Sequence, residues 1–349
     1  MNEDWLTFLD QAGARIVDGT VTDFGDARAE TEAAANGNVI ADLSHFGVIR
    51  ARGADATNYL QNQLTNDVRQ VSRAHSQLTA HCSPKGRILT SFRLFQRGDD
   101  YILRAPTDTV TASLARLHKY ILMSKVTLED ISDKLVRFGL SGPDAPARLA
   151  DALSDVPSNV DEVTEGGGVT TVQVSAAPPR YELYGEPEPM RALWKKLSQG
   201  ATPVGAPAWG LLDIRAGIPA IYPATVEAFV PQMVNLHLVN GVSFRKGCYP
   251  GQEVVARMQY LGKLKRRMYL AHVQSTKRPL PGEELFAPSD ESGQGTGKVV
   301  DAQPAPEGGY DLLAVLQISA AEVGDVHLDD EQGPLLSLKP LPYAHQEQI

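Results

Sequence analysis

The order of strand-like and helix-like segments constrains the fold of this 349-residue chain more than any other feature. Up to about residue 262, strand patterns, Gly or Pro turns and helix patterns follow one another without the regular strand–helix–strand units of a parallel sheet. The chain then repeats short strand patterns at nearly even spacing, over 263–275, 282–287 and 310–319. This order predicts an α+β protein that ends in a small β-barrel or sandwich.

A domain boundary is therefore expected after residue 262, between a first region of 1–262 and a second of 263–349. Within the first region, apolar residues at helical spacing predict a helix over 107–130. Residues 201–262 are rich in Pro and Gly, apolar and without clear periodicity. This segment is expected to consist mostly of loops that build a site.

The formal net charge of the chain is −9. An acidic protein gains little overall from counterion release, so any contact with nucleic acid needs a local basic patch. Seven cations gather in one such stretch: Arg245, Lys246, Arg257, Lys263, Lys265, Arg266 and Arg267. The stretch 245–267 is either a surface for carboxylates, phosphates or RNA, or a solvated hairpin face.

Two observations predict a cytoplasmic protein without a membrane partner. No apolar stretch approaches the roughly 20 residues of a membrane span. The N-terminal segment 1–19 has acidic residues where a signal peptide has basic ones, and no apolar run follows it.

The chain has two cysteines, Cys82 and Cys248. Two thiols cannot supply a four-thiolate zinc or iron–sulfur site, and no histidines stand at ligand spacing, so no metal is expected. Cys248 lies between basic residues and a Gly/Pro turn in "RKGCYPGQE", 245–253. Nearby cations favour a reactive thiolate, whereas a buried and inert thiol is the alternative. For Cys82 a structural role is expected.

Trp209 stands in the Pro- and Gly-rich context "GAPAWGLLDIRAG" and not on an amphipathic face. Such a tryptophan either offers a stacking plane to a flat ring or anchors the core beneath a loop.

The motif "KGCYPGQE", 246–253, resembles the signature of the YgfZ-type folate-binding proteins, which are relatives of the glycine-cleavage T-protein, an aminomethyltransferase. Three other stretches are similar to the same family: "DLSHFGVIRARGADATNYLQNQLTND" (42–67), "HCSPKGRILTSFRLF" (81–95) and "AGIPAIYPATVEAFVPQMVNLH" (216–237). The resemblance extends over roughly residues 35–335, nearly the whole chain.

This resemblance implies a T-protein-like ring of three subdomains around a central cavity. Two interwoven α+β subdomains would form 1–262 and a small β-barrel 263–349. Tetrahydrofolate or a one-carbon derivative would bind in the cavity. The positions that match the family's folate contacts, or belong to its motif, are Trp209, Phe46, Glu227, Asn235, Lys246, Tyr249 and Gln252. Cys248 matches the cysteine that the family needs for its chemistry.

The implied function is that of an accessory protein for the synthesis or repair of iron–sulfur clusters in client enzymes, tRNA-modifying ones included. Folate and these clients are the expected partners, and a weak RNA contact through 245–267 is left open. The alternative is a folate-dependent one-carbon transferase or demethylase, so whether the chain is an enzyme stays open.

Two departures from the T-protein matter. Thr90 and Ser91 stand where it has paired acidic residues, and a hydroxyl cannot balance a developing cationic amine as a carboxylate does. This argues against aminomethyl transfer from glycine. In "LDIRAG", Asp213 and Arg215 look like the family's ion pair with the signs exchanged.

Overall fold

The computed structural model describes residues 2–289 and 295–344, which group into two compact units. Unit 1 consists of Met1–Leu60, Val68–Gln77 and Phe92–Gly210. Unit 2 consists of Gln61–Asp67, Leu78–Ser91 and Leu211–Ile349. The boundary expected after residue 262 falls inside unit 2, shortly before β14 (Arg266–Val273) begins.

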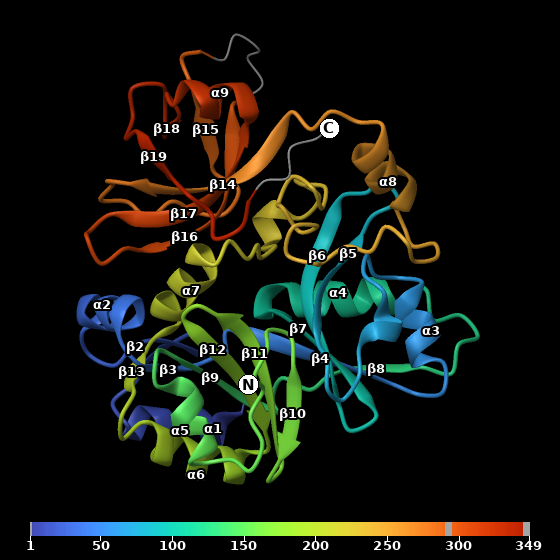
Figure 1. Cartoon of the computed structure of the whole chain (residues 1–349), viewed down its shortest axis with the longest axis vertical. Coiled ribbons are helices and arrows are strands. Elements are labelled where there is room, and N and C mark those ends of the chain that lie inside the picture. Colours follow the sequence, from blue (N-terminus) through green and yellow to red (C-terminus); the bar gives the residue numbers. More distant parts are fainter. Residues whose placement is uncertain (1, 290–294, 345–349) are drawn as a thin grey trace. The chain divides into compact units, whose positions relative to one another are not determined.

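A six-stranded sheet forms the centre of unit 1 (Figure 1). Its order is β10 (Val163–Gly166), β11 (Val169–Ala176), β12 (Pro179–Gly185), β9 (Val136–Ser141), β3 (Val39–Asp42) and β13 (Thr202–Val204). Only β13 and β3 pair in parallel, and the other pairs are antiparallel. Every residue of β9 and β3 is buried, as expected for central strands that are covered on both faces.

Helix α6 (Pro187–Leu197) packs against this sheet and against α1 (Glu3–Gln11). Its buried residues Met190, Leu193, Trp194 and Leu197 recur at helical spacing and form one apolar face. The indole of Trp194 meets the Phe138 ring edge-on, with 5.3 Å between the ring centroids. Burial of these aromatic side chains supplies much of the hydrophobic stabilisation of unit 1.

A five-stranded sheet has the order β5 (Gln77–Cys82), β6 (Ile88–Arg97), β7 (Asp100–Pro106), β4 (Phe46–Arg52) and β8 (Thr127–Asp130). The helix predicted over 107–130 is wrong in its second half. Helix α4 comprises only Thr107–His118, and Thr127–Asp130 pairs with β4 instead. Leu122 has a φ of 41°, so the chain leaves the helical region there, and strand pairing outweighs local helix propensity.

The smaller elements of unit 1 connect these layers. They are β1 (Arg15–Val17), β2 (Thr20–Asp23), α2 (Ala27–Asn36), α3 (Ala56–Gln61), which extends one residue into unit 2, the 3₁₀ helix Val68–Gln70, and α5 (Ala145–Ala150).

The short C-terminal strands predicted from the sequence are confirmed in unit 2, where they form one sheet that curls into a half-barrel (Figure 1). Its order is β18 (His327–Leu328), β15 (Glu284–Phe286), β16 (Gly297–Pro304), β17 (Tyr310–Gln317), β14 and β19 (Leu336–Lys339). Helix α9 (Ile318–Val323) follows β17. Helices and antiparallel sheets thus combine as the predicted α+β class requires.

The segment 201–262 contains more regular structure than expected. Helix α7 (Ala206–Arg215) starts in unit 1 and ends in unit 2, and α8 (Gln252–Tyr260) and a 3₁₀ turn (Pro223–Thr225) follow in unit 2. Trp209 therefore lies on a helix and not in a loop. Pro207 fits the first turn of α7, where a missing N–H costs nothing, and the helix is largely buried, so its sequence shows no amphipathic period.

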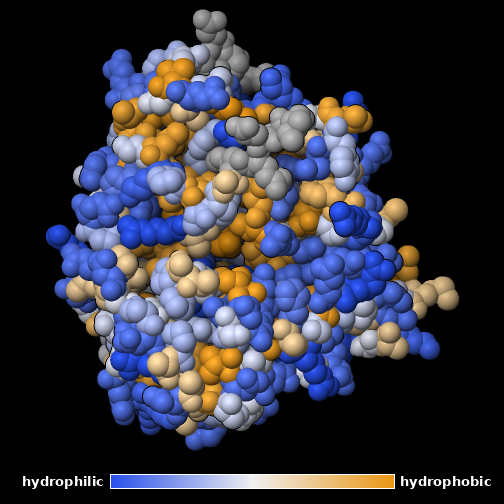
Figure 2. Space-filling model, viewed as in Figure 1, coloured by the Kyte–Doolittle hydropathy of each residue, from blue (hydrophilic) through white to orange (hydrophobic). Residues whose placement is uncertain are grey.

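Hydrophilic residues cover most of the molecular face drawn in Figure 2, and hydrophobic residues reach it in smaller groups. Within residues 2–289 and 295–344, no helix has the length and apolar character needed to cross a membrane.

Candidate functional site

The motif 246–253, here called the cysteine turn, presents its thiol on the surface of unit 2. Cys248 and the preceding Gly247 are exposed, whereas Lys246 and Tyr249 on either side are buried. A Cβ added to Gly247 would meet no atom within 4 Å, so the space around this part of the turn is open. The alternative of a buried Cys248 is therefore wrong, and the thiol is accessible to a reagent or partner.

Lys246 fixes the base of the cysteine turn. Its Nζ donates hydrogen bonds to the backbone carbonyls of Gln61, Leu64 and Asn66, the last at 3.1 Å. An ammonium has three N–H donors, and these three acceptors match them. The ammonium also lies 5.2 Å from the centre of the Tyr249 ring, a cation–π contact. These contacts explain the burial of Lys246 without a ligand, and its predicted contact with folate stays a prediction.

Two glycines allow the cysteine turn to pack closely on the turn between β5 and β6. Gly251 has a φ of 79°, and a Cβ there would lie 2.4 Å from the carbonyl oxygen of Ser83. A Cβ on Gly86 would lie 2.8 Å from the Cβ of Val254 in α8. Gln252 begins α8 and its Nε2 donates to the carbonyl of Lys246 at 3.3 Å, which closes the turn. Backbone packing thus holds the exposed thiol in place.

Cys82 lies in β5 and has the opposite environment. It is buried in the apolar core of unit 2, and burial raises the pKa of its thiol to about 12. A thiol with so high a pKa is almost entirely protonated at neutral pH and is a poor nucleophile. Burial likewise raises the pKa of Tyr249. The structural role expected for Cys82 agrees with this burial.

Glu227 and Asn235 both have left-handed backbone conformations, with φ values of 60° and 56°. Asn235 is buried, and its Nδ2 donates to the carbonyl of Met268 in β14 at 2.9 Å. Glu227 is exposed, and its backbone N–H donates to the carbonyl of Ile88 at 2.8 Å. A glutamate in this region is uncommon, and such strain persists where surrounding contacts impose it. Glu227 therefore presents a carboxylate to solvent, whereas Asn235 anchors the half-barrel.

In unit 1, Trp209 lies on the centre of the six-stranded sheet. Its indole packs on Gly139 of β9, where an added Cβ would lie 2.2 Å from Cη2 of the ring. The Arg180 guanidinium lies 5.4 Å from the ring centre. The side chain is 0% exposed, yet its indole Nε1 has no hydrogen-bond partner among the described residues. A buried donor without an acceptor requires an explanation, and an absent ligand or water is one.

Phe46 belongs to the same unit and starts β4. The guanidinium of Arg104 lies over its ring at 4.0 Å and also forms an ion pair of 2.8 Å with the buried carboxylate of Glu182. Burial alone would raise the pKa of Glu182, but Arg104, Arg93 and the Tyr184 hydroxyl bring it below its usual value. Glu182 therefore stays a carboxylate. Guanidinium groups, a carboxylate and aromatic rings together suit a flat, polar heterocycle.

The residues Trp209, Phe46, Arg104, Arg180 and Glu182 are here called the buried cluster of unit 1. Its three charged members were not predicted as site residues. The sequence "RYELYG" in β12 contained the signal, because alternate residues of a strand share one face. Arg180 and Glu182 are both buried on such a face, and buried charges require partners. Burial also lowers the pKa of nearby His45 to about 3, with Arg104 and Arg137 adding to the effect.

The positions that differ from the T-protein have structural roles in unit 2. The hydroxyl of Ser91 accepts a hydrogen bond from the backbone N–H of Ile221 at 3.2 Å, and Thr90 is buried. Arg215 pairs with Asp311 at 2.8 Å, and residues two apart on a helix point in different directions. The ion pair suggested between Asp213 and Arg215 stays a prediction.

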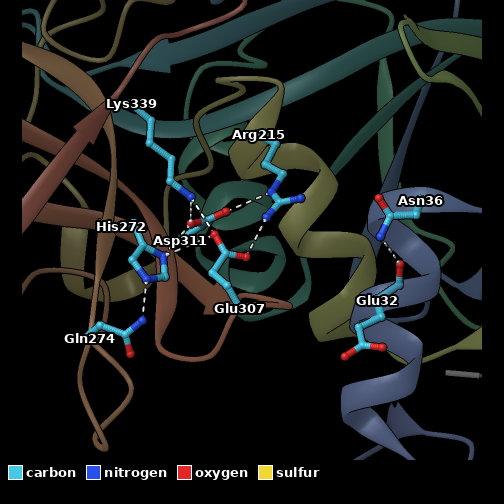
Figure 3. A network of polar contacts seen from close by, with 8 residues as sticks. All are labelled: Glu32, Asn36, Arg215, His272, Gln274, Glu307, Asp311 and Lys339. Carbon is cyan, nitrogen blue, oxygen red and sulfur yellow. Dashed lines mark hydrogen bonds and ion pairs between the residues drawn. The ribbon is translucent and has the colours of Figure 1, made fainter.

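Arg215 belongs to a network in which His272, Glu307, Asp311 and Lys339 converge (Figure 3). Its histidine and two carboxylates have the spacing of a metal site. The Lys339 ammonium, however, lies 2.9 Å from Glu307 and 2.8 Å from Asp311, and with Arg215 it balances both negative charges. A divalent cation would have to displace them, so the network is best described as ion pairs.

The basic residues of 245–267 do not share one role. Lys246 is buried, and Arg267 lies beside the Tyr269 ring at 5.4 Å. Four cations are exposed on and around α8: Arg245, Arg257, Lys263 and Lys265. Apolar side chains are exposed in the same segment, with Tyr260 67% and Leu261 85% accessible.

Comparisons with known proteins agree with the predicted family. The GCVT N-terminal domain family matches residues 20–239. The chain is 34% identical over 305 residues to the "tRNA-modifying protein YgfZ" of Yersinia pseudotuberculosis serotype IB (strain PB1/+), with 87% of this chain and 92% of that protein covered. It is 33% identical over 308 residues to the protein of the same name from Colwellia psychrerythraea (strain 34H / ATCC BAA-681), with the same coverage.

Among solved structures, the glycine cleavage system aminomethyltransferase T from Bartonella henselae is similar, with a TM-score of 0.75. The two chains are 19% identical, and the match covers 97% of this chain and 96% of that one. At this identity the likeness establishes the fold and not the activity.

Proposed function

Because the chain belongs to the YgfZ family of proteins with a GCVT N-terminal domain, we propose that it is a folate-binding accessory protein in tRNA modification. It supports the synthesis or repair of iron–sulfur clusters in client enzymes, and the thiol of Cys248 is its reactive group. The iron–sulfur cluster, or sulfur for it, is a substrate of this process and not a resident cofactor of the protein.

The contrast between the two cysteines carries this proposal. Cys248 is exposed on a turn whose base is fixed by the Lys246 hydrogen bonds and by the packing of Gly251. Cys82 is buried, with its pKa raised to about 12. A fixed, accessible thiol suits attack on a partner molecule, whereas a buried thiol does not.

A single thiolate suits transient sulfur chemistry. It can attack one sulfur of a partner disulfide, or the outer sulfur of a partner persulfide. In each case a new S–S bond to Cys248 forms, the old S–S bond breaks, and the partner's other sulfur leaves as a thiolate. No net oxidation or reduction occurs, so the exchange itself needs no additional electron donor.

The buried cluster of unit 1 supports folate as the cofactor. Trp209 and Phe46 supply aromatic rings, Glu182 supplies a hydrogen-bond acceptor, and the unsatisfied Nε1 of Trp209 supplies a donor. A pteridine ring has polar N–H and C=O groups on a flat body, so these residues fit it. Bound tetrahydrofolate would supply one-carbon or reducing chemistry, while these side chains bind and orient it.

The exposed face of α8 and the residues after it supports a docking role for the client or its tRNA. Arg257, Lys263 and Lys265 offer positive charge to an acidic partner, and Tyr260 and Leu261 offer apolar area. Mixed basic and apolar surface of this kind is typical of protein interfaces. The RNA contact left open by the sequence belongs to the same surface.

Complementation with matched variants tests the proposal. In a strain that lacks the protein, Cys248→Ala should leave client iron–sulfur enzyme activity and the thiolated bases of tRNA at the level of the empty strain. Gly247→Ala, next to it in open space, should restore both. Both variants should unfold within about 0.5 kcal/mol of wild type. Full restoration by Cys248→Ala would show that the thiol is not the reactive group.

A further inference from the structure

Unit 2 contains a pocket that is lined by none of the predicted folate contacts and not by Cys248; of the basic stretch 245–267, Arg266 lines it. Its volume is about 230 Å³. Apolar side chains and three cations surround it: Arg87, Ala228, Phe229, Met233, Arg266, Lys298 and Val315.

The half-barrel forms one wall of this pocket. Val315 of β17 pairs with Lys298 of β16 on one side and with Met268 of β14 on the other. Arg266 precedes Met268 by two residues, so both lie on the same face of β14. The sheet register therefore places the Arg266 guanidinium and the Lys298 ammonium on the two sides of the apolar Val315.

The segment 228–233 and the start of β6 form the opposite wall. Arg87 donates a hydrogen bond from Nη1 to the carbonyl of Ala228 at 2.6 Å. The next residue, Ile88, donates its backbone N–H to the carbonyl of Phe229 at 2.8 Å. Backbone hydrogen bonds thus hold Arg87 and Phe229 together, and this wall is built before any ligand binds.

Among the side chains that the structure describes around the pocket, positive charge exceeds negative charge. Arg266 donates to the carbonyl of Gly295 at 2.8 Å, and in residues 2–289 and 295–344 neither it nor Arg87 pairs with a carboxylate. Lys298 has one acidic partner, Glu284, at 3.1 Å. Both members of that pair are solvent-accessible, so the pair is weak and readily exchanged for a ligand. Two guanidinium groups facing an apolar cavity favour a bound anion.

We propose that this pocket binds a small amphiphilic anion, a carboxylate or phosphate group carried on a short apolar body. The anion would face Arg87, Arg266 and Lys298, and the apolar body would contact Phe229, Met233 and Val315. The volume equals that of about eight water molecules at roughly 30 Å³ each. It lies below the roughly 300–1,000 Å³ of pockets for drug-sized ligands, so the ligand is a fragment such as a single substituted ring. The inference goes beyond the proposed function and needs neither folate nor Cys248.

Binding of simple probes to the whole protein tests this inference. Phenyl phosphate and benzoate carry the two anions on the same ring. Inorganic phosphate and formate are the anions without the ring, and phenol is a ring without the anion. Saturation-transfer NMR detects binding of each, and titration gives its dissociation constant. Arg266→Gln and Lys298→Gln remove pocket charges, the second at a solvent-accessible position. Arg267→Gln is the matched control, because this neighbour points to the opposite face of β14.

We expect phenyl phosphate, benzoate or both to bind more tightly than their halves. Arg266→Gln should weaken binding about tenfold or more and Lys298→Gln severalfold, because each loses a charge-assisted contact. Arg267→Gln should stay within about twofold of wild type. Three results would each overturn the inference: no binding of either ring-bearing probe at about 10 mM, equal losses in Arg266→Gln and Arg267→Gln, or inorganic phosphate binding as tightly as the tighter of the two ring-bearing probes.

Discussion

Replacing Lys246 by methionine tests whether this residue positions the cysteine turn or binds the cofactor. Methionine keeps an unbranched side chain of similar length but has no N–H donors. The carbonyls of Gln61, Leu64 and Asn66 would lose the ammonium that now bonds them. If Lys246 is a positioning residue, Lys246→Met destabilises unit 2. If it mainly contacts folate, the variant loses affinity for folate and keeps its stability.

The magnitude follows from the three hydrogen bonds. A hydrogen bond to a charged group contributes about 1.5–3 kcal/mol. In the unfolded wild-type protein the ammonium of Lys246 is hydrated again. This hydration offsets several kcal/mol of the summed contribution of the three hydrogen bonds. We therefore expect Lys246→Met to lower the free energy of unfolding by about 3–5 kcal/mol. The exposed neighbour Arg245 provides the matched control, because Arg245→Met should change it by less than about 0.5 kcal/mol.

The assay has to report on unit 2. All three tryptophans, Trp5, Trp194 and Trp209, belong to unit 1, so their fluorescence does not. Cys82 is buried in unit 2, and its reaction with a thiol reagent reports opening of that unit. In a Cys248→Ala background, Lys246→Met should raise the labelling rate of Cys82 at least about 100-fold. Labelling at the wild-type rate would refute the positioning role of Lys246.

Two further predictions concern unit 2. Burial raises the pKa of Asp301 to about 6, while Tyr222 donates a hydrogen bond to it at 2.9 Å. The native state binds the proton of the Asp301 carboxyl more tightly than the unfolded state does. The contribution of this proton to the free energy of unfolding is therefore complete below about pH 4 and is lost as the pH rises through about 6. Asp301→Asn should therefore raise the free energy of unfolding at pH 7 by up to about 3 kcal/mol and flatten its pH dependence in urea titrations; an unchanged pH profile would contradict this. Gly251→Ala places a Cβ 2.4 Å from the Ser83 carbonyl at a φ of 79°, so it should cost at least about 2 kcal/mol in the same titrations, whereas Gly247→Ala should be neutral.

Local patterns predicted the half-barrel well. Its strands are short and are separated by turn residues, so each can be identified from its own sequence. Helix α7 is largely buried and therefore lacks an amphipathic period, which is why Trp209 was expected in a loop. Local patterns predict a helix over 127–130, because the partner β4 of this strand lies far away in the sequence.

Some residues of the candidate site could also be predicted from the sequence, and others could not. The motif around Cys248 indicated the residue that we propose to be reactive, whereas the contacts of Lys246 with residues 61–66 are revealed by no local pattern. The cluster of Arg104 with Glu182 was missed because it joins strands 78 positions apart. The sequence indicates candidate residues by their chemical type and motif. The structure is needed to find residues that are paired with partners far away in the sequence.

Titration of the protein with tetrahydrofolate, followed by calorimetry, tests the central claim of folate binding most directly. We expect saturable binding of one folate per chain, and we expect Glu182→Gln and Phe46→Leu to weaken it about tenfold or more, because each changes a side chain of the buried cluster. Gly247→Ala should bind as wild type does. The absence of binding at about 1 mM tetrahydrofolate, in a wild-type protein with normal unfolding behaviour, would contradict the account.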